Sequence, residues 1–237
     1  MTESRARSAA SAGAGVRPVA RMSVTDSVFH EIRRSILSGD LRPGEEFSQR
    51  KLAESLDVSF IPVREALRRL EGQGLVVNGQ GKSSRVAPLS HDDLHGIYRL
   101  RRQLEPEIAA RACILLDPPE LDRLVEVAHS FADEAANIDD VYEAHHEFHR
   151  ALLAPAATAW DLSTLETLWR AAERYIRLAF SARDDDPHEH DNRAQVHTEL
   201  VDAYKSQDPE LVYGATLAHL DHNESIAHGA VQVDDSA

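Results

Sequence analysis

The sequence predicts a mostly α-helical protein in which an N-terminal winged helix-turn-helix domain precedes an all-α antiparallel helical bundle. Three observations predict this fold. Short amphipathic stretches followed by a glycine-rich hairpin occupy the first part of the chain, and apolar residues recur at helical spacing from His91 onward. The 237 residues, 42% of them hydrophobic, also suffice for two cores.

Composition divides the chain into segments of different charge. The net charge of −14 is the balance of +3 on residues 1–22, +1 on 23–88 and −18 on 89–237. This asymmetry lets one domain approach phosphates while the other is repelled from them, although acidic helix surfaces alone would also produce it. The expected segments are a disordered arm over 1–22, the winged helix-turn-helix over 23–88, the helical bundle over 92–229 and a flexible tail over 230–237.

Cysteine usage and hydropathy indicate a cytoplasmic protein. The single cysteine, Cys113, cannot form an internal disulfide. No apolar run approaches the ~18 residues of a membrane-spanning helix, and residues 1–22 lack the apolar stretch of a secretory signal. No membrane partner is therefore expected.

Apolar periodicity and capping residues predict the first two helices. Val28, Ile32 and Ile36 lie four residues apart and indicate one buried stripe on a helix over 24–37. After a Pro-Gly turn, Ser48 is placed to cap a short second helix.

The third helix and a hairpin complete the first domain. Ser59 is placed to cap this helix, Pro62 suits its first turn, and its predicted inner face holds Val63, Ala66, Leu67 and Leu70. The stretches 75–77 and 83–87 predict two strands around a glycine-rich tip. Two helices joined by a tight turn set the second helix in a major groove, while the wing reaches the neighbouring backbone.

A series of motifs covers nearly the whole of this segment in a fixed order. They are Ile36-Leu37-Ser38-Gly39, Leu41-Arg42-Pro43-Gly44, Leu52-Ala53, the run from Pro62 to Glu71, and Gly74-Leu75-Val76. In this order they resemble the DNA-binding domain of the GntR superfamily of bacterial transcriptional regulators. The resemblance implies that the partner of this domain is double-stranded operator DNA.

The predicted DNA contacts follow from the resemblance. Arg50 and Arg64 would contact DNA from the second and third helices, and the full set is Arg50, Ser59, Phe60, Arg64, Arg68, Gly81 and Lys82, with Gly81 at the wing tip. Phe60 departs from the family, which usually has a guanine-reading arginine there. Because phenylalanine cannot donate the two hydrogen bonds that recognise guanine, we expect a changed operator preference. The alternatives are that Phe60 packs inside and that Arg68 belongs to a solvated helix face.

Six helices are predicted in the second domain. Apolar spacing and Asp-Pro starts place them over about 94–112, 120–136, 140–153, 162–182, 193–206 and 209–227. Aromatic residues among the middle helices are expected to pack in the core, and these are Trp160, Trp169, Tyr175 and Phe180.

Histidine spacing indicates a metal site in this domain. His145 and His149 lie four residues apart on one helix face, as two ligands of one ion would, although among thirteen histidines the pair alone is weak evidence. The wider pattern comprises Arg101-Arg102-Gln103-Leu104-Glu105, the run from Glu147 to Leu152, His197 ahead of Asp208-Pro209, and His219-Leu220. This pattern is similar to the ligand-binding FCD domain of the FadR-like branch of the GntR superfamily.

The resemblance implies a divalent metal held by His149, His197 and His219. His145 stands where the family has an aspartate, so the predicted site contains four imidazoles. Imidazole ligates Zn²⁺ and Ni²⁺ well, and the loss of the carboxylate leaves a more positive site that favours an anionic ligand. The remaining histidines of the domain are expected at the surface or outside the ligand shell, and they include His146, His188, His190, His222 and His228.

The effector implied by the resemblance is a small organic acid, with Arg101 as its carboxylate clamp. Alternatively, Arg101 pairs with an internal glutamate and the histidines are ordinary core or surface residues. We expect a homodimer, since two-fold symmetric operators require one, and we expect repression. Two other functions stay open: a DNA-binding protein with a purely structural helical dimerisation domain, and a metalloenzyme, for which no HExxH-type motif is present.

Overall fold

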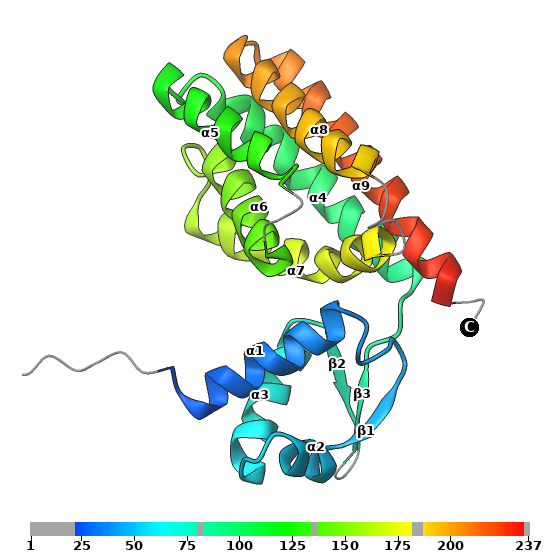
Figure 1. The fold of residues 1–237 in the computed structure, drawn as a ribbon. Helices are drawn as coiled ribbons and strands as arrows, with labels where there is room; N and C mark the ends of the chain where they lie inside the picture. Colours follow the sequence, from blue (N-terminus) through cyan, green and yellow to red (C-terminus); the bar gives the residue numbers. More distant parts are fainter. Residues whose placement is uncertain (1–21, 80–82, 134–136, 182–186, 235–237) are drawn as a thin grey trace, which may run out of the picture.

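The computed structural model describes residues 22–79, 83–133, 137–181 and 187–234. Two domains are stacked along the long axis of the molecule and joined by one short linker (Figure 1). The fold is mostly helical with one small sheet, as predicted. Residues 1–21 of the arm expected over 1–22, and the wing residues Gly81 and Lys82, lie outside the described residues.

The first domain is built from three helices and a three-stranded sheet. Its elements are α1 (Val24–Leu37), β1 (Glu46–Ser48), α2 (Gln49–Ser55), α3 (Phe60–Gly72), β2 (Val76–Asn78) and β3 (Ser83–Val86). The core forms where α1 and α3 cross, because Ile32, Leu67 and Leu70 are fully buried there. The predicted helices and hairpin are therefore present.

The first strand, β1, was not predicted from the sequence. It pairs antiparallel with β3, which lies between β1 and β2. Beside this pairing, the buried Gln49 donates from Nε2 to Ser84 Oγ at 2.9 Å. A three-residue strand contains too little alternation to be recognised, and its partner lies more than thirty residues later in the chain.

A tight turn sets α3 against α2. Asp57 adopts a left-handed conformation with φ of 50°, and the Val58 amide donates back to the Ala53 carbonyl at 3.1 Å. Ser48 caps α2 through its hydroxyl, as predicted. Ser59 occupies the N-cap position of α3 but makes no side-chain capping bond, so the expected capping bond at this residue is wrong. Its hydroxyl is left exposed at the start of the helix.

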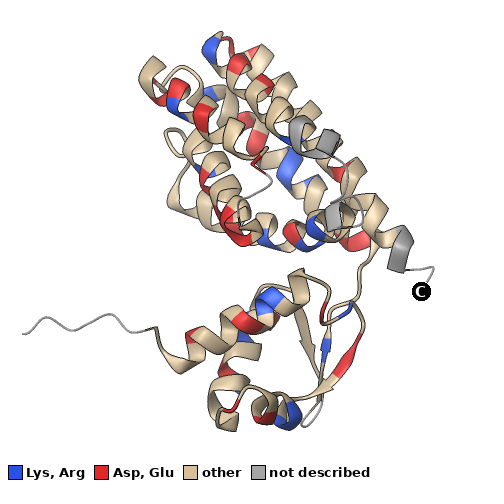
Figure 2. Ribbon diagram, viewed as in Figure 1, with Lys and Arg blue, Asp and Glu red and all other residues tan. Residues whose placement is uncertain are grey.

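The second domain is the predicted helical bundle. Its helices are α4 (His91–Ala112), α5 (Pro118–Ser130), α6 (Ile138–Leu153), α7 (Ala159–Ser181), α8 (Pro187–Lys205) and α9 (Pro209–Asp234). Side chains of Ser90, Asp117 and Asn137 cap α4, α5 and α6. The long helix α4 packs against α9 and α7, while α5 packs against α8. Acidic residues occur on helices throughout this domain (Figure 2).

Two sequence expectations require correction here. Helix α9 continues to Asp234, so the flexible tail expected from residue 230 does not begin there, and the reason is that Ala230 and Val231 are buried. Trp160 is 85% exposed rather than packed in the core, because it lies in the first turn of α7, beyond the region covered by neighbouring helices. Trp169 and Tyr175 are buried as expected, and the side chain of Phe180 lies outside the described residues.

Within the described residues, every helix is too short or too polar to cross a bilayer.

Candidate functional site

The exposed face of α3 forms the candidate DNA contact. Val63, Ala66 and Leu67 fix the inner face of the helix in the core, so the opposite face points to solvent. That face presents Arg64 and Arg68, and neither makes an ion pair among the described residues. Two unpaired guanidinium groups on an exposed helix are available for phosphates or base edges.

The other predicted DNA contacts lie around this face. Phe60 is 36% exposed at the first turn of α3, so it is not a core residue. Arg50 is exposed on α2 but holds Glu54 at 3.0 Å, one turn along the same helix. Arg69 has a structural role instead, since it pairs with Asp26 of α1 at 2.6 Å and lies over the ring of Phe29. Of the arginines described on α2 and α3, Arg64 and Arg68 are therefore the two without an ion pair.

A cluster of histidines lies inside the helical domain. His145 and His149 come from α6, His197 from α8 and His219 from α9. Their rings contact one another, with centroids 4.5 Å apart for His145 and His149 and 4.7 Å for His197 and His219. Three helices thus bring together all four residues predicted as ligands.

Three of the ring nitrogens converge. His145 Nε2 lies 2.9 Å from His197 Nε2 and 3.2 Å from His149 Nε2. His197 Nδ1 donates to the Arg193 carbonyl at 2.6 Å, which leaves the lone pair of His197 on Nε2. Because His145 Nε2 holds either one proton or one lone pair, it cannot bond well to both neighbours.

Burial keeps these imidazoles neutral. Burial lowers the pKa of His197 to about 4 and holds the pKa values of His145, His149 and His219 well below their usual range. Neighbouring imidazoles lower the values for His145 and His149 further, because a second positive charge would be repelled. Neutral imidazole is the form that ligates metals.

The donor set fits a divalent metal ion. In tetrahedral coordination at about 2.0–2.1 Å, ligand nitrogens lie about 3.3 Å apart, close to the separations observed here. His145, His149 and His197 form the described set whose ligand atoms all approach one another. His219 is adjacent but outside that set, and its Nε2 lies 3.0 Å from the side-chain amide nitrogen of Asn223. Its Nδ1 is buried without a hydrogen-bond partner among the described residues.

Arg101 borders the same cavity but is not a free cation. It donates from Nε to Glu105 Oε1 at 2.6 Å, and Trp169 Nε1 donates to the same oxygen at 2.9 Å. Glu105 is therefore the internal glutamate that the sequence analysis gave as an alternative partner of Arg101. Arg101 remains part of the cavity wall, and Glu105 compensates its charge.

The cavity beside the histidines has a volume of about 50 Å³. This is room for a few water-sized groups, whereas sites for small organic ligands usually offer several hundred Å³. Its wall combines apolar side chains with polar ones from α6 to α9, among them Tyr142, His146, Glu173, Asn192 and His222. An organic ligand must therefore displace part of the wall.

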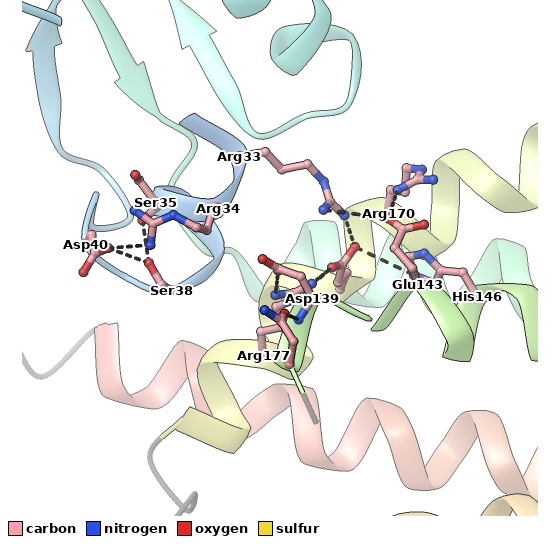
Figure 3. A network of polar contacts seen from close by, with 12 residues as sticks. Arg33, Arg34, Ser35, Ser38, Asp40, Asp139, Glu143, His146, Arg170 and Arg177 are labelled. Atoms are coloured by element: carbon pink, nitrogen blue, oxygen red, sulfur yellow. Dashed lines mark hydrogen bonds and ion pairs between the residues drawn. The ribbon is translucent and has the colours of Figure 1, made fainter. Parts of the chain in front are cut away.

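Glu173, one of the residues in the cavity wall, also forms an ion pair with the first domain. Glu173 on α7, whose side chain is 1% exposed, accepts from Arg33 of α1 and from Arg177 Nε at 2.8 Å. His146 Nε2 lies 3.8 Å from the same carboxylate. Figure 3 shows Arg33 reaching from α1 into the group of charged residues on α6 and α7.

Sequence reasoning missed this junction. Arg33 and Glu173 are 140 residues apart, and neither belongs to a recognisable motif. His146 was expected at the surface or outside the ligand shell, and it lines the cavity, as does His222. The side chains of His188 and His190 lie outside the described residues.

Comparisons with known proteins agree with this architecture. The family of bacterial regulatory proteins named gntR matches residues 24–86, and the FCD domain family matches residues 96–222. The HTH-type transcriptional regulator BphR of Paraburkholderia xenovorans is 28% identical over 88% of this chain and 87% of its own length. The HTH-type transcriptional repressor RspR of Escherichia coli is 26% identical over 83% and 86%. The solved structure of E. coli McbR/YncC matches with a TM-score of 0.70 at 24% identity, covering 88% of this chain and 98% of that one.

The exposed helix and the ligand-domain architecture define a DNA-binding regulator of transcription rather than an enzyme. The chain belongs to the gntR family of bacterial regulators, in the group that carries an FCD domain.

The metal-free protein should lose stability in mild acid. Between about pH 6.5 and 4, the unfolded chain binds protons on His146 and His197 that the folded chain excludes, since burial lowers both folded pKa values to about 4. The free energy of unfolding should therefore fall by about 1.4 kcal/mol per pH unit for each such histidine as the pH decreases. Urea titrations at several pH values, with a chelator present, measure this change in the free energy of unfolding.

His129→Ala, at the exposed end of α5, is the matched control and should leave the slope unchanged. His146→Gln should reduce the slope. Equal unfolding free energies at the two ends of this pH range would show that the imidazoles are not held neutral.

Proposed function

We propose that the chain is a homodimeric repressor whose affinity for a two-fold symmetric operator is set by a small organic anion bound beside a metal ion. The convergence of three Nε2 atoms supports this most strongly, because this set of described ligand atoms consists of imidazoles and suits a cation. The name of RspR, a transcriptional repressor, supports the sign of regulation.

The metal would be held by His145, His149 and His197, with His219 as a fourth ligand once Asn223 releases it. Zn²⁺ or Ni²⁺ suits imidazole ligands. When bound by the first three imidazoles, the ion would supply positive charge and a fourth coordination position that either His219 or an anionic oxygen could fill. An all-imidazole shell keeps the full charge of the ion, which favours an organic acid over a neutral ligand.

The protein's own residues would orient that anion. Asn192 and the histidines outside the metal-binding set offer hydrogen bonds from the cavity wall, while Tyr98 and Ile176 provide apolar surface. Arg101 would act in concert with Glu105 rather than as a lone clamp. Because the cavity is small, the anion must push on the wall that contains Glu173.

Glu173 would couple the ligand site to the DNA-binding domain. It bounds the cavity on one side and holds Arg33 of the first domain on the other, so a shift of α7 would change how the DNA-binding domain docks. Arg174 adds a second link, donating to the Ala87 carbonyl in the linker at 3.0 Å. If the first domain can dock on the helical domain in two ways, a ligand that binds one of them more tightly would alter operator affinity, typically by about 1–3 kcal/mol.

Arg64→Ala should weaken DNA binding. Loss of a base or phosphate contact predicts an affinity about 5- to 150-fold lower at fixed salt, from roughly 1–3 kcal/mol. Fluorescence anisotropy on a fragment that the wild-type protein selects from random DNA measures this. Arg111→Ala removes the same charge from the end of α4 in the helical domain and should have no effect. Unchanged affinity in Arg64→Ala would exclude the assigned contact.

His149→Ala combined with His197→Ala should remove tightly bound metal. Protein dialysed against metal-free buffer should retain about one ion per chain in the wild type and almost none in the variant, because two of three ligands are lost. DNA affinity without effector should be unaffected. A variant that retains the ion would exclude these ligands, and His129→Ala serves as the control.

Arg33→Ala and Glu173→Gln should each loosen the domain junction. Removing one partner of a buried pair costs about 3–5 kcal/mol, so hydrogen exchange in linker residues 87–90 should become roughly tenfold faster or more. Arg34→Ala is the matched control, since Arg34 lies on the same helix but pairs locally with Glu31 and Asp40. If all three variants exchange alike, Glu173 does not hold the first domain.

A further inference from the structure

A second cavity lies between the two domains, and the proposed function does not use it. Its volume is about 660 Å³, within the roughly 300–1,000 Å³ of sites for small organic molecules, which are often found between domains. Residues of α1 and α3 from the first domain and of α6 and α7 from the second form its walls, and we call it the interdomain cavity. Among the residues that the structure describes, three carboxylates and four arginines line it, and the arginines are Arg33, Arg34, Arg69 and Arg170.

Positive charge gathers at the wall that the helical domain contributes. Arg33 and Arg177 both hold Glu173, and Arg170 holds Glu143 at 3.2 Å. Figure 3 shows these groups together. Burial lowers the pKa of Arg33, and Arg170 and Arg177 lower it further, while the opposing effect of Glu173 does not outweigh them. A further anion close to Arg33 would therefore stabilise its charged form.

Glu143 marks the place where such an anion fits. Its Oε1 lies 3.2 Å from Arg170 Nη1 and 4.0 Å from Arg33 Nη1, so one carboxylate oxygen lies between two guanidinium groups. The side chain of Glu143 is 54% exposed and that of Arg170 is 32% exposed. Because exposed ion pairs add little stability, the carboxylate or phosphate group of a ligand can replace Glu143 there.

Two buried polar atoms lack a hydrogen-bond partner at the same cavity. One is Gln73 Oε1, at the C-cap of α3, and the other is Arg33 Nε, although Nη2 of that guanidinium pairs with Glu173. Both atoms are covered, so a ligand reaches them only when a side chain above them moves, as displacement of Glu143 would allow. A ligand that accepts a hydrogen bond from Arg33 and donates one to Gln73 would satisfy both atoms.

We infer that the interdomain cavity is a second ligand site, which binds a small organic oxyanion carrying a hydroxyl or amide donor and requires no metal. The oxyanion, a carboxylate or a phosphate group, takes the place of Glu143 between Arg33 and Arg170. The hydroxyl or amide group of the ligand donates to Gln73 Oε1.

The position of the site gives the ligand a direct effect on domain docking. Its walls belong to both domains, so a bound molecule holds α1 and α3 against α6 and α7. The histidine cavity, in contrast, is lined by residues of the helical domain. The two sites therefore act on the same domain junction from different sides of Glu173.

Isothermal titration of metal-free protein tests this site independently of the histidine cluster. The full chain is dialysed against the neutral chelator 1,10-phenanthroline and titrated with glycerol 3-phosphate or with glycerate at constant ionic strength. At least one probe should bind saturably, and the preferred probe identifies the oxyanion as phosphate or carboxylate. Arg170→Ala should weaken that binding roughly tenfold or more, and Gln73→Met about two- to tenfold, because the first loses a charged hydrogen bond and the second a neutral one.

Glu143→Gln should change the affinity in the opposite direction. It removes the competing carboxylate at nearly constant side-chain volume, so the probe should bind roughly two- to fivefold more tightly, as expected from the loss of an exposed ion pair. Glu166→Gln and Arg123→Ala are the matched controls and should change nothing. Glu166 is 52% exposed and pairs with Arg150, Arg123 is exposed on α5, and neither lines the cavity.

Three results would overturn the second site while leaving the buried histidine site untouched. They are the absence of saturable binding for both probes, weaker binding in Glu143→Gln, and an affinity that Arg170→Ala does not lower.

Discussion

Desolvation of several neighbouring imidazoles is the constraint on which the helical domain depends. His145, His149 and His197 are held neutral by burial, and their Nε2 atoms face one another rather than protein donors. Such an arrangement leaves buried lone pairs facing one another, and a cation would satisfy them together. In the proposed function, the positive charge of such an ion would favour an anionic ligand.

The same interior reaches the DNA-binding domain through one residue. Glu173 is buried, bounds the cavity and pairs with Arg33 of α1, so ligand site and domain junction share a carboxylate. A buried ion pair adds little net stability to the folded protein. Separating its two partners is nevertheless costly when either charge stays buried without the other. The proposed ligand control of DNA binding would require this junction to adopt more than one arrangement.

Most of the correct predictions of helices and site residues came from patterns within a single element. Apolar stripes and caps located the helices because these signals lie within one element, and spacing along α6 placed His145 and His149 on one face. Features that depend on distant parts of the chain were missed. The strand β1 forms because it pairs with β3. Trp160 is exposed because neighbouring helices do not extend over it. The role of Glu173 depends on Arg33, a partner in the other domain.

X-ray absorption at the metal edge of protein purified with Zn²⁺ measures whether imidazoles of the buried cluster ligate the ion. We expect a first shell containing at least three nitrogens at about 2.0–2.1 Å, with the multiple scattering of imidazole rings. A first shell of oxygen alone, or one containing sulfur at about 2.3 Å, would contradict it.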